Sequence, residues 1–184
     1  MLPGTLFALA FAASTSQATP LTKPEDVVKA ITGTWLYLNV TSYYDNGTIS
    51  RHEEASLGRY PVGLLNYNAQ GFMSANFMSA RPEDRPPGVD TEKIEIGTDA
   101  EWSLIGKHTL SYSGPWYVSE TTKDVEVGQI THGPTRVAWL PSWVGKELVK
   151  NYTLLEDGTI MRLRSKNDEG INGDMFFTRL AGGD

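Results

Sequence analysis

Cysteine is absent from this 184-residue chain, which excludes disulfide bonds and thiol chemistry. Basic residues are also few, because 16 Lys and Arg stand against 22 Asp and Glu and leave a formal net charge of -6. Nucleic-acid binders normally carry a basic patch, so no nucleic-acid partner is expected. The fold must depend on a hydrophobic core, and the length suits one domain with one such core.

Motifs for metal binding and covalent catalysis are missing as well. The three histidines, His52, His108 and His132, have no spacing that presents two metal ligands from one element. No G-x-S-x-G nucleophile elbow and no G-x-G-x-x-G phosphate loop occurs. The sequence therefore predicts neither a metal site nor a cofactor.

Charge is absent from residues 1–18, where an apolar run is followed by small residues at Ser16 and Ala18. This pattern predicts a secretory signal cleaved after Ala18, and the run is too short to span a membrane. The alternative is a retained N-terminal helix in a cytoplasmic protein, since a basic n-region is missing. Three glycosylation sequons, which begin at Asn39, Asn46 and Asn151, favour the secretory route and a glycoprotein.

The rest of the chain has the pattern of a β protein. Residues 19–30 are expected to form a linker and a short helix from Pro24, because proline suits the first helical position. From residue 31 to 184, short alternating runs are separated by turn signals such as Asn46-Gly47. Strands are expected at residues 34–42, 63–67, 72–79, 108–113, 116–121, 125–132, 135–140, 147–154, 159–165 and 174–180. Even spacing predicts a single all-β domain, an antiparallel up-and-down β-barrel of about 8 to 10 strands with a short N-terminal helix.

Two connecting segments differ from this pattern. The proline-rich residues 80–88 are incompatible with a strand and predict a surface loop or lid. Residues 91–105 are expected to form a helix or an irregular segment beside the barrel.

The first strand opens with Gly33-Thr34-Trp35, and we expect the Trp35 indole to plug one end of the barrel. Asn39 has the same strand parity as Trp35, so an outward glycan on Asn39 conflicts with an inward Trp35. Either a β-bulge separates these two residues, or Trp35 lies at the end of the barrel.

Several stretches also keep a distinctive order and spacing. They are Gly33 to Trp35, Pro61 to Tyr67 with Gly71 to Ala75, Arg81, Tyr112 to Val118, Thr131-His132, Leu140 to Gly145, and Thr153 to Leu163. Together they resemble the lipocalin-like domain family of bacteria and fungi over residues 30–180. The resemblance implies a calycin-type β-barrel with an internal ligand cavity, and some fungal members catalyse cyclisation or isomerisation in secondary metabolism without a cofactor. Lys150 stands where the family more often has Arg, which replaces a planar fork with a flexible point charge.

Four residues are candidates for acid-base chemistry: His132, Lys150, Tyr112 and Arg81. If Asn151 faces outward, period two turns Lys150 inward, where a lysine could bind an acid or enolate or move a proton. Otherwise Lys150 is solvated. His132 ends its strand and is expected at the barrel rim as a general acid or base, or else as a plain hydrogen-bonded histidine. Arg81 heads the proline-rich loop and could close over a ligand carboxylate.

A second set of residues is expected to contact a ligand through hydroxyl, amide and stacking groups, although core packing is the alternative for each aromatic side chain. The set is Tyr67, Asn76, Trp116, Trp139, Trp143 and Tyr152, with Trp139 and Trp143 as an apolar wall at the barrel mouth.

Three functions fit these features. The leading hypothesis is a cofactor-free biosynthetic cyclase or isomerase that holds a small apolar, polyketide- or terpenoid-like molecule and assists by positioning and acid-base groups. The second is a carrier that binds the same kind of molecule without chemistry. The third is a structural protein with a filled core, which needs no polar group inside.

Overall fold

The computed structural model describes residues 23–51, 56–58, 60–89 and 97–181. The predicted signal segment, 1–18, and His52 lie outside the described residues. None of the helices within these ranges has the length and apolar character needed to cross a membrane.

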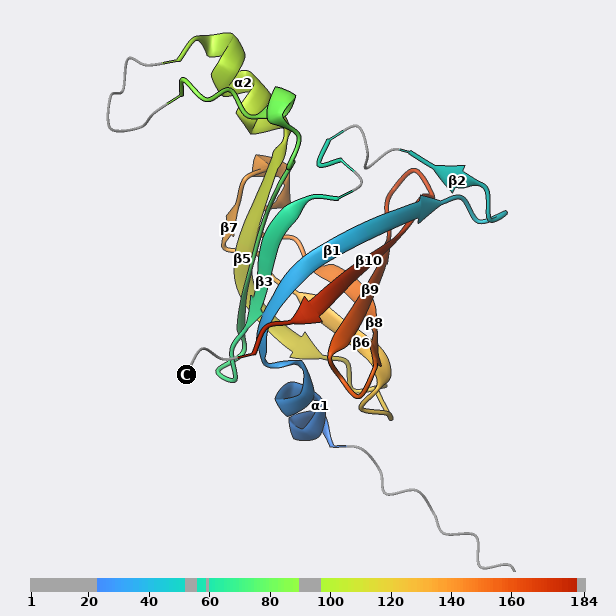
Figure 1. The fold of residues 1–184 in the computed structure, drawn as a ribbon. Coiled ribbons are helices and arrows are strands. Elements are labelled where there is room, and N and C mark those ends of the chain that lie inside the picture. The colour runs from blue at the N-terminus through green and yellow to red at the C-terminus, as the bar shows by residue number, and fades with distance from the viewer. Residues whose placement is uncertain (1–22, 52–55, 59, 90–96, 182–184) are drawn as a thin grey trace, which may run out of the picture.

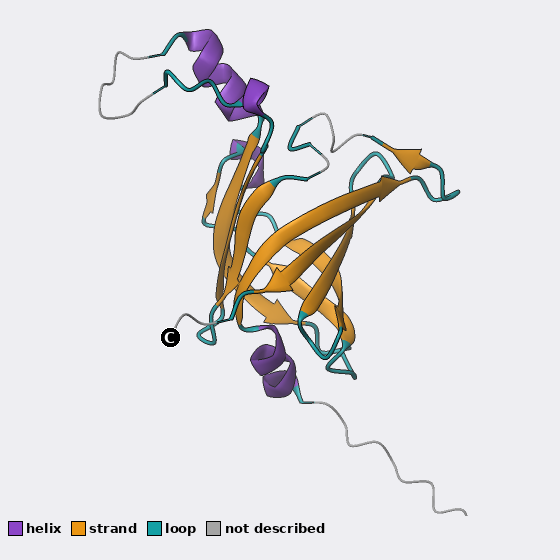
Figure 2. Cartoon of the chain, in the orientation of Figure 1, coloured by secondary structure: helices purple, strands orange, loops and turns teal. Residues whose placement is uncertain are grey.

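Strands dominate the described residues, where two α-helices and two 3-10 turns lie outside the sheet (Figures 1 and 2). In chain order the elements are α1 (Pro24–Ile31), β1 (Gly33–Tyr43), β2 (Ile49–Ser50), β3 (Val62–Tyr67), β4 (Phe72–Met78), η2 (Pro82–Asp84), α2 (Asp99–Lys107), β5 (Thr109–Val118), β6 (Val127–His132), β7 (Val137–Ala138), η3 (Pro141–Trp143), β8 (Leu148–Leu155), β9 (Ile160–Lys166) and β10 (Asn172–Arg179). The short N-terminal helix begins at Pro24, as predicted.

Eight strands form a closed antiparallel barrel in the order β1-β3-β4-β5-β6-β8-β9-β10, and β10 pairs back with β1. The two short strands are extra, because β2 pairs only with β1 and β7 only with β5. Consecutive barrel strands are neighbours throughout, so the predicted up-and-down β-barrel is confirmed.

Two predicted strand boundaries are wrong. Residues 108–113 and 116–121 were expected as two strands, but β5 runs through Gly114 and Pro115 without a break. A Cβ added at Gly114 would lie 3.0 Å from the Pro134 carbonyl oxygen, so glycine here favours close packing of two backbones and does not mark a turn. Pro115 needs no N–H here, because it contributes its carbonyl oxygen, which accepts a 2.7 Å hydrogen bond from the Gly133 N–H.

The other wrong boundary is the strand expected at residues 135–140. Only Val137–Ala138 pairs with β5, and the chain then turns into η3 at Pro141. Of residues 91–105, which the sequence left open, 91–96 lie outside the described residues, and α2 begins at Asp99 and runs to Lys107, at the end of the barrel opposite α1 (Figure 1).

A β-bulge interrupts β1 between Tyr37 and Asn39, where the register against β10 shifts by one residue. Trp35 and Tyr37 face the core before the bulge, and Val40 and Ser42 face it afterwards. The bulge turns Asn39 to the outer face while Trp35 stays inside, which resolves the parity conflict. Glycosylation and entry into a secretory pathway stay predictions.

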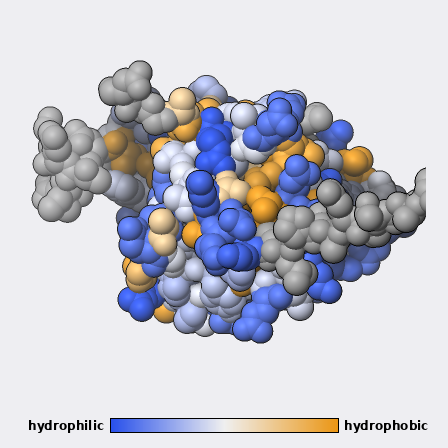
Figure 3. Space-filling view, turned by 90° about the horizontal axis from the view of Figure 1, so that it is seen from below, coloured by the Kyte–Doolittle hydropathy of each residue, from blue (hydrophilic) through white to orange (hydrophobic). Residues whose placement is uncertain are grey.

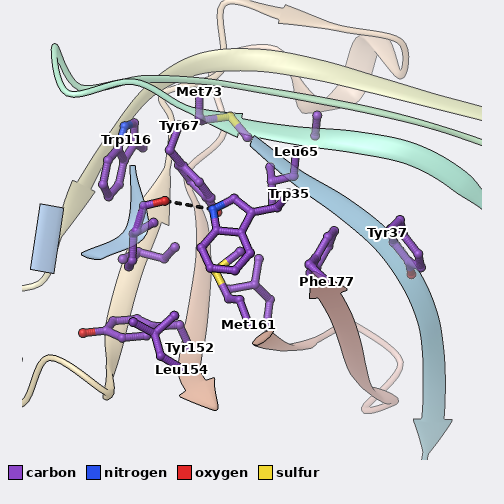
Figure 4. Close-up of a cluster of buried hydrophobic side chains, with 14 of the residues drawn as sticks. Trp35, Tyr37, Leu65, Tyr67, Met73, Trp116, Tyr152, Leu154, Met161 and Phe177 are labelled. Carbon is purple, nitrogen blue, oxygen red and sulfur yellow. Dashed lines mark hydrogen bonds between the residues drawn. The ribbon is translucent and has the colours of Figure 1, made fainter. Parts of the chain in front are cut away.

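Trp35 lies at the end of the barrel that α1 covers (Figure 4). Its indole is fully buried, and its Nε1 donates a 2.8 Å hydrogen bond to the carbonyl oxygen of Ile31, the last residue of α1. The Arg179 guanidinium carbon lies 4.1 Å from the centre of the indole ring. These contacts match the role of structural plug. Seen from below, hydrophilic side chains surround a smaller hydrophobic area (Figure 3).

We expect the substitution Arg179→Ala to lower the free energy of unfolding by about 2 kcal/mol. Arg179 stacks on Trp35 and donates hydrogen bonds to the carbonyl oxygens of Thr32, at 2.8 Å, and Ala30. It thereby joins β10 to the end of α1. Urea unfolding measures the change, and Arg136→Ala, which removes an exposed arginine, is the control. An equal effect of the two substitutions would contradict this role of Arg179.

Candidate functional site

The candidate site is a buried histidine held between two tyrosines from other strands. His132, the last residue of β6, is fully buried. The Tyr67 hydroxyl oxygen lies 2.6 Å from His132 Nε2, and the Tyr112 hydroxyl oxygen lies 3.0 Å from His132 Nδ1. Tyr67 and Tyr112 are 2% and 6% exposed, so water has little access to this cluster.

Burial keeps all three groups neutral. Burial, together with the smaller effect of the Lys150 charge, lowers the pKa of His132 to about 3. Burial raises the pKa of Tyr67 well above its usual value, with a further rise from Tyr112, and burial also raises the pKa of Tyr112. Both tyrosines therefore keep their protons near neutral pH, and the histidine stays uncharged.

A neutral imidazole has one donor and one acceptor nitrogen, so the hydrogen bonds must run in one direction through the cluster. One tyrosine donates to His132, and His132 donates to the hydroxyl oxygen of the other. The second tyrosine keeps its own O–H proton available for another acceptor. A change of histidine tautomer reverses the direction.

Two tryptophans fix the tyrosine rings. Trp116 makes an edge contact with Tyr67 at a centroid distance of 4.8 Å, and its Nε1 donates to the Asn68 carbonyl oxygen at 3.2 Å. Trp143 makes an edge contact with Tyr112 at 5.5 Å. The hydroxyl groups are thus held in place by packing from two sides.

Lys150 belongs to β8 and lies on the inner face of the barrel, near this cluster. It pairs with Ile130, whose side chain is buried in the core, while Leu148 pairs with His132. Tyr152, two residues further along, is also buried, and its hydroxyl donates to the Asp124 carbonyl oxygen at 3.0 Å. Burial, together with the smaller effect of the Asp124 charge, raises the pKa of Tyr152 to about 12. The parity expected from an outward Asn151 therefore holds for Lys150 and Tyr152.

Solvent reaches part of the barrel interior. Leu110, Leu148, Lys150 and Met175 share inner-face register positions with core residues but are only partly buried. Three of these four inner-face side chains are apolar.

Three predicted site residues lie elsewhere, namely Asn76, Trp139 and Arg81. Asn76 was expected to contact a ligand, but it is exposed on the outer face and accepts a 2.7 Å hydrogen bond from Ser111, because Ala75 and Phe77 occupy the inner face of β4. Trp139, half exposed, donates to the Gly106 carbonyl oxygen at the end of α2, so only Trp143 of the expected wall contacts the cluster. His132 is fully buried and hydrogen-bonded, which agrees with the second of its two expected roles.

Arg81 belongs to a separate cluster beyond the Met78 end of β4. Its Nε lies 2.6 Å from a carboxylate oxygen of Asp84, which also accepts a 2.6 Å hydrogen bond from Ser79. His108 Nε2 lies 3.4 Å from the other carboxylate oxygen. The structure therefore ties Arg81 to the proline-rich loop and does not bring it to His132.

The direct contact of Tyr67 with His132 is what sequence reasoning missed, since Tyr67 was predicted only as a ligand contact. The two residues are 65 positions apart, and no local motif joins them. Within the described ranges, no group of three or more potential ligands among His, Asp and Glu is placed to hold a metal ion.

Comparison with known proteins identifies the domain type. A profile of the lipocalin-like domain matches residues 32–178. No curated protein matches the sequence. Among solved structures, a redesigned β-barrel is 12% identical with a TM-score of 0.38, covering 85% of this chain and 96% of its own. A redesigned β-barrel bound to DFHBI is 11% identical with a TM-score of 0.36, covering 84% of this chain and 99% of its own. A designed fluorescence-activating β-barrel is 10% identical with a TM-score of 0.38, covering 84% and 98%.

Proposed function

The chain belongs to the lipocalin-like domain family, and we propose that it is a cofactor-independent isomerase or cyclase acting on a small, mainly apolar molecule held inside the barrel. The observation that carries this proposal is the neutral His132 between the hydroxyl groups of Tyr67 and Tyr112. A structural core would be served by apolar side chains at these positions, whereas this arrangement provides a proton donor and a proton acceptor in one water-poor site.

The proposed step moves one proton without leaving charge on the protein. The tyrosine that receives the histidine N–H gives its hydroxyl proton to a substrate oxygen or carbon, and takes the histidine proton in return. The other tyrosine gives its proton to His132 and removes a proton from a second position of the substrate. The substrate has then exchanged one bonded proton for another, and His132 has changed tautomer.

Lys150 assists through its charge. It lies on the inner face beside the cluster, and its charge contributes to the lowered pKa of His132. The same positive charge would stabilise an enolate that develops on the substrate beside it. The surrounding Leu110, Leu148 and Met175 side chains would hold the apolar body of the molecule and favour one folded conformation.

The experiment follows deuterium transfer from solvent. Small molecules that copurify with the protein are identified by mass spectrometry and then incubated with fresh protein in D2O. We expect wild-type protein to introduce deuterium at a carbon position of the small molecule. Tyr67→Phe or Tyr112→Phe should slow deuterium incorporation by about a hundredfold, because each removes one of the two hydroxyl groups that bind His132. Tyr117→Phe, which removes the hydroxyl that donates to Glu147 on the outer face, should leave the rate unchanged.

Two results would contradict the enzyme proposal. A copurifying molecule that gains no deuterium and is released unaltered would identify a carrier. Equal deuterium incorporation by wild-type protein and both inner-face tyrosine variants would show that the cluster does not move the proton.

A further inference from the structure

We propose a second binding site, on the outside of the barrel, for a small hydrophilic molecule that carries a carboxylate or phosphate group. A groove with a volume of about 690 Å³ lies on the outer face of β6, β8 and β9, beside the loop that contains residues 121–124. This volume is in the range of small-molecule sites. None of the residues that line the groove belongs to the His132 cluster, so this inference does not depend on the proposed enzyme activity.

The floor of the groove consists of outward-facing polar side chains from three adjacent strands. Gln129 pairs with Asn151, Asn151 with Arg164, and Thr153 with Arg162, so these side chains share one face. The Gln129 side-chain amide donates to the Asn151 amide oxygen at 3.2 Å. The floor therefore offers hydroxyl, amide and guanidinium groups side by side, which is the set of groups that binds polar, hydroxylated molecules.

Charge in the groove favours an anion. Arg162 donates a 2.9 Å hydrogen bond to the Thr153 hydroxyl, and no carboxylate in the described part of the chain pairs with it. Lys123 adds a second positive charge from the loop, and Asp124 is the one acidic residue among those that line the groove. In a protein with a net charge of -6, this local excess of positive charge stands out.

Arg164 is held differently from Arg162. Its Nε and Nη2 donate to the two carboxylate oxygens of Asp174 at 2.7 and 2.8 Å, and these hydrogen bonds raise the pKa of Arg164 above its usual value. The positive charge of Arg164 is thus balanced by Asp174, and the side chain is fixed in position. Arg162 is left as the guanidinium that can bind a planar oxyanion through two parallel N–H groups.

The loop beside the groove is held in place without a ligand. The Thr122 hydroxyl accepts from the Gln129 N–H at 3.1 Å and donates to the Gln129 carbonyl oxygen at 3.3 Å. The Tyr152 hydroxyl binds the Asp124 carbonyl oxygen. Gly128 permits this close approach, because a Cβ there would lie 2.3 Å from Thr122 Cγ2. A site formed in advance loses less entropy when a ligand binds.

The test uses full-length protein made in a bacterial host, so that Asn151 is unmodified. Glucuronate, glucose 6-phosphate and glucose are titrated while NMR follows the Arg162 Nε–H and the side-chain amides of Gln129 and Asn151. We expect at least one of the two anionic sugars to shift these signals, and the comparison tells carboxylate from phosphate. Arg162→Gln should weaken binding at least tenfold, and Arg136→Gln, which removes an exposed arginine elsewhere, should not change it.

Arg162→Lys provides a second variant that keeps the charge but not the planar fork, and we expect intermediate affinity. Shifts of equal size with neutral glucose would overturn the proposal, as would unchanged affinity in Arg162→Gln. The absence of any shift with both anionic sugars would overturn it as well.

Discussion

Replacing Trp35 by alanine is expected to lower the free energy of unfolding by about 3–5 kcal/mol, because it removes the largest fully buried side chain of the barrel. The indole packs at the closed end, beside Leu65 and Met161 (Figure 4). Its loss would leave a cavity that the strands cannot fill, since the barrel is closed by β10 pairing with β1. Urea unfolding followed by circular dichroism measures the change.

Two further variants separate the causes of this effect. Trp35→Phe keeps much of the packing but loses the Nε1 hydrogen bond to Ile31, and we expect a loss of about 1–2 kcal/mol. Trp139→Ala, at a half-exposed tryptophan, should cost less than about 1 kcal/mol. If Trp35→Ala and Trp139→Ala were equally stable, Trp35 would not be the structural plug of the barrel.

The barrel itself could be predicted from the sequence because its signals are local. Alternation of side chains and turn residues such as Asn46-Gly47 place strands with little tertiary information. These local signals predicted the wrong strand ends where tertiary contacts decide the conformation. Gly114 and Pro115 have the composition of a turn, but the backbone at Pro134 packs on Gly114 and keeps β5 continuous.

Parity was the most informative argument about single residues. The conflict between Asn39 and Trp35 predicted a β-bulge as one of two solutions, and the bulge lies between Tyr37 and Asn39. The same argument placed Lys150 and Tyr152 on the inner face. It works because period two is fixed by strand geometry and one known orientation determines the others.

The candidate site was less accessible to such reasoning. Tyr67, Tyr112 and His132 were each singled out, but their mutual contact depends on the tilt and closure of the barrel, which set the distances across its interior. Asn76 was misplaced because the parity of β4 had not been tied to a known orientation. Arg81 was misplaced because Asp84, its partner three residues later, was not considered.

Burial of His132 should make the protein less stable as the pH falls. The folded protein holds the pKa of His132 at about 3, below the ordinary value of 6.5 that applies to the unfolded chain. Between these two pH values the unfolded chain binds a proton that the folded protein does not. The contribution of His132 to the free energy of unfolding is therefore fully present above pH 6.5 and is lost as the pH falls toward 3. From pH 7 to 4.5 we expect this one residue to account for a loss of about 2–3 kcal/mol.

The measurement compares urea unfolding of wild-type protein and His132→Gln at both pH values, because glutamine can still hydrogen-bond to both tyrosines but does not titrate. Carboxylates change the free energy of unfolding with pH equally in both proteins. The difference between the two pH dependences therefore gives the contribution of His132. NMR of the His132 ring in wild-type protein provides a check that needs no variant, since its nitrogens should keep the neutral pattern at pH 5. An imidazolium signal at that pH would contradict both the stability prediction and the directional hydrogen-bond chain, because a charged His132 donates from both nitrogens and cannot accept from either tyrosine.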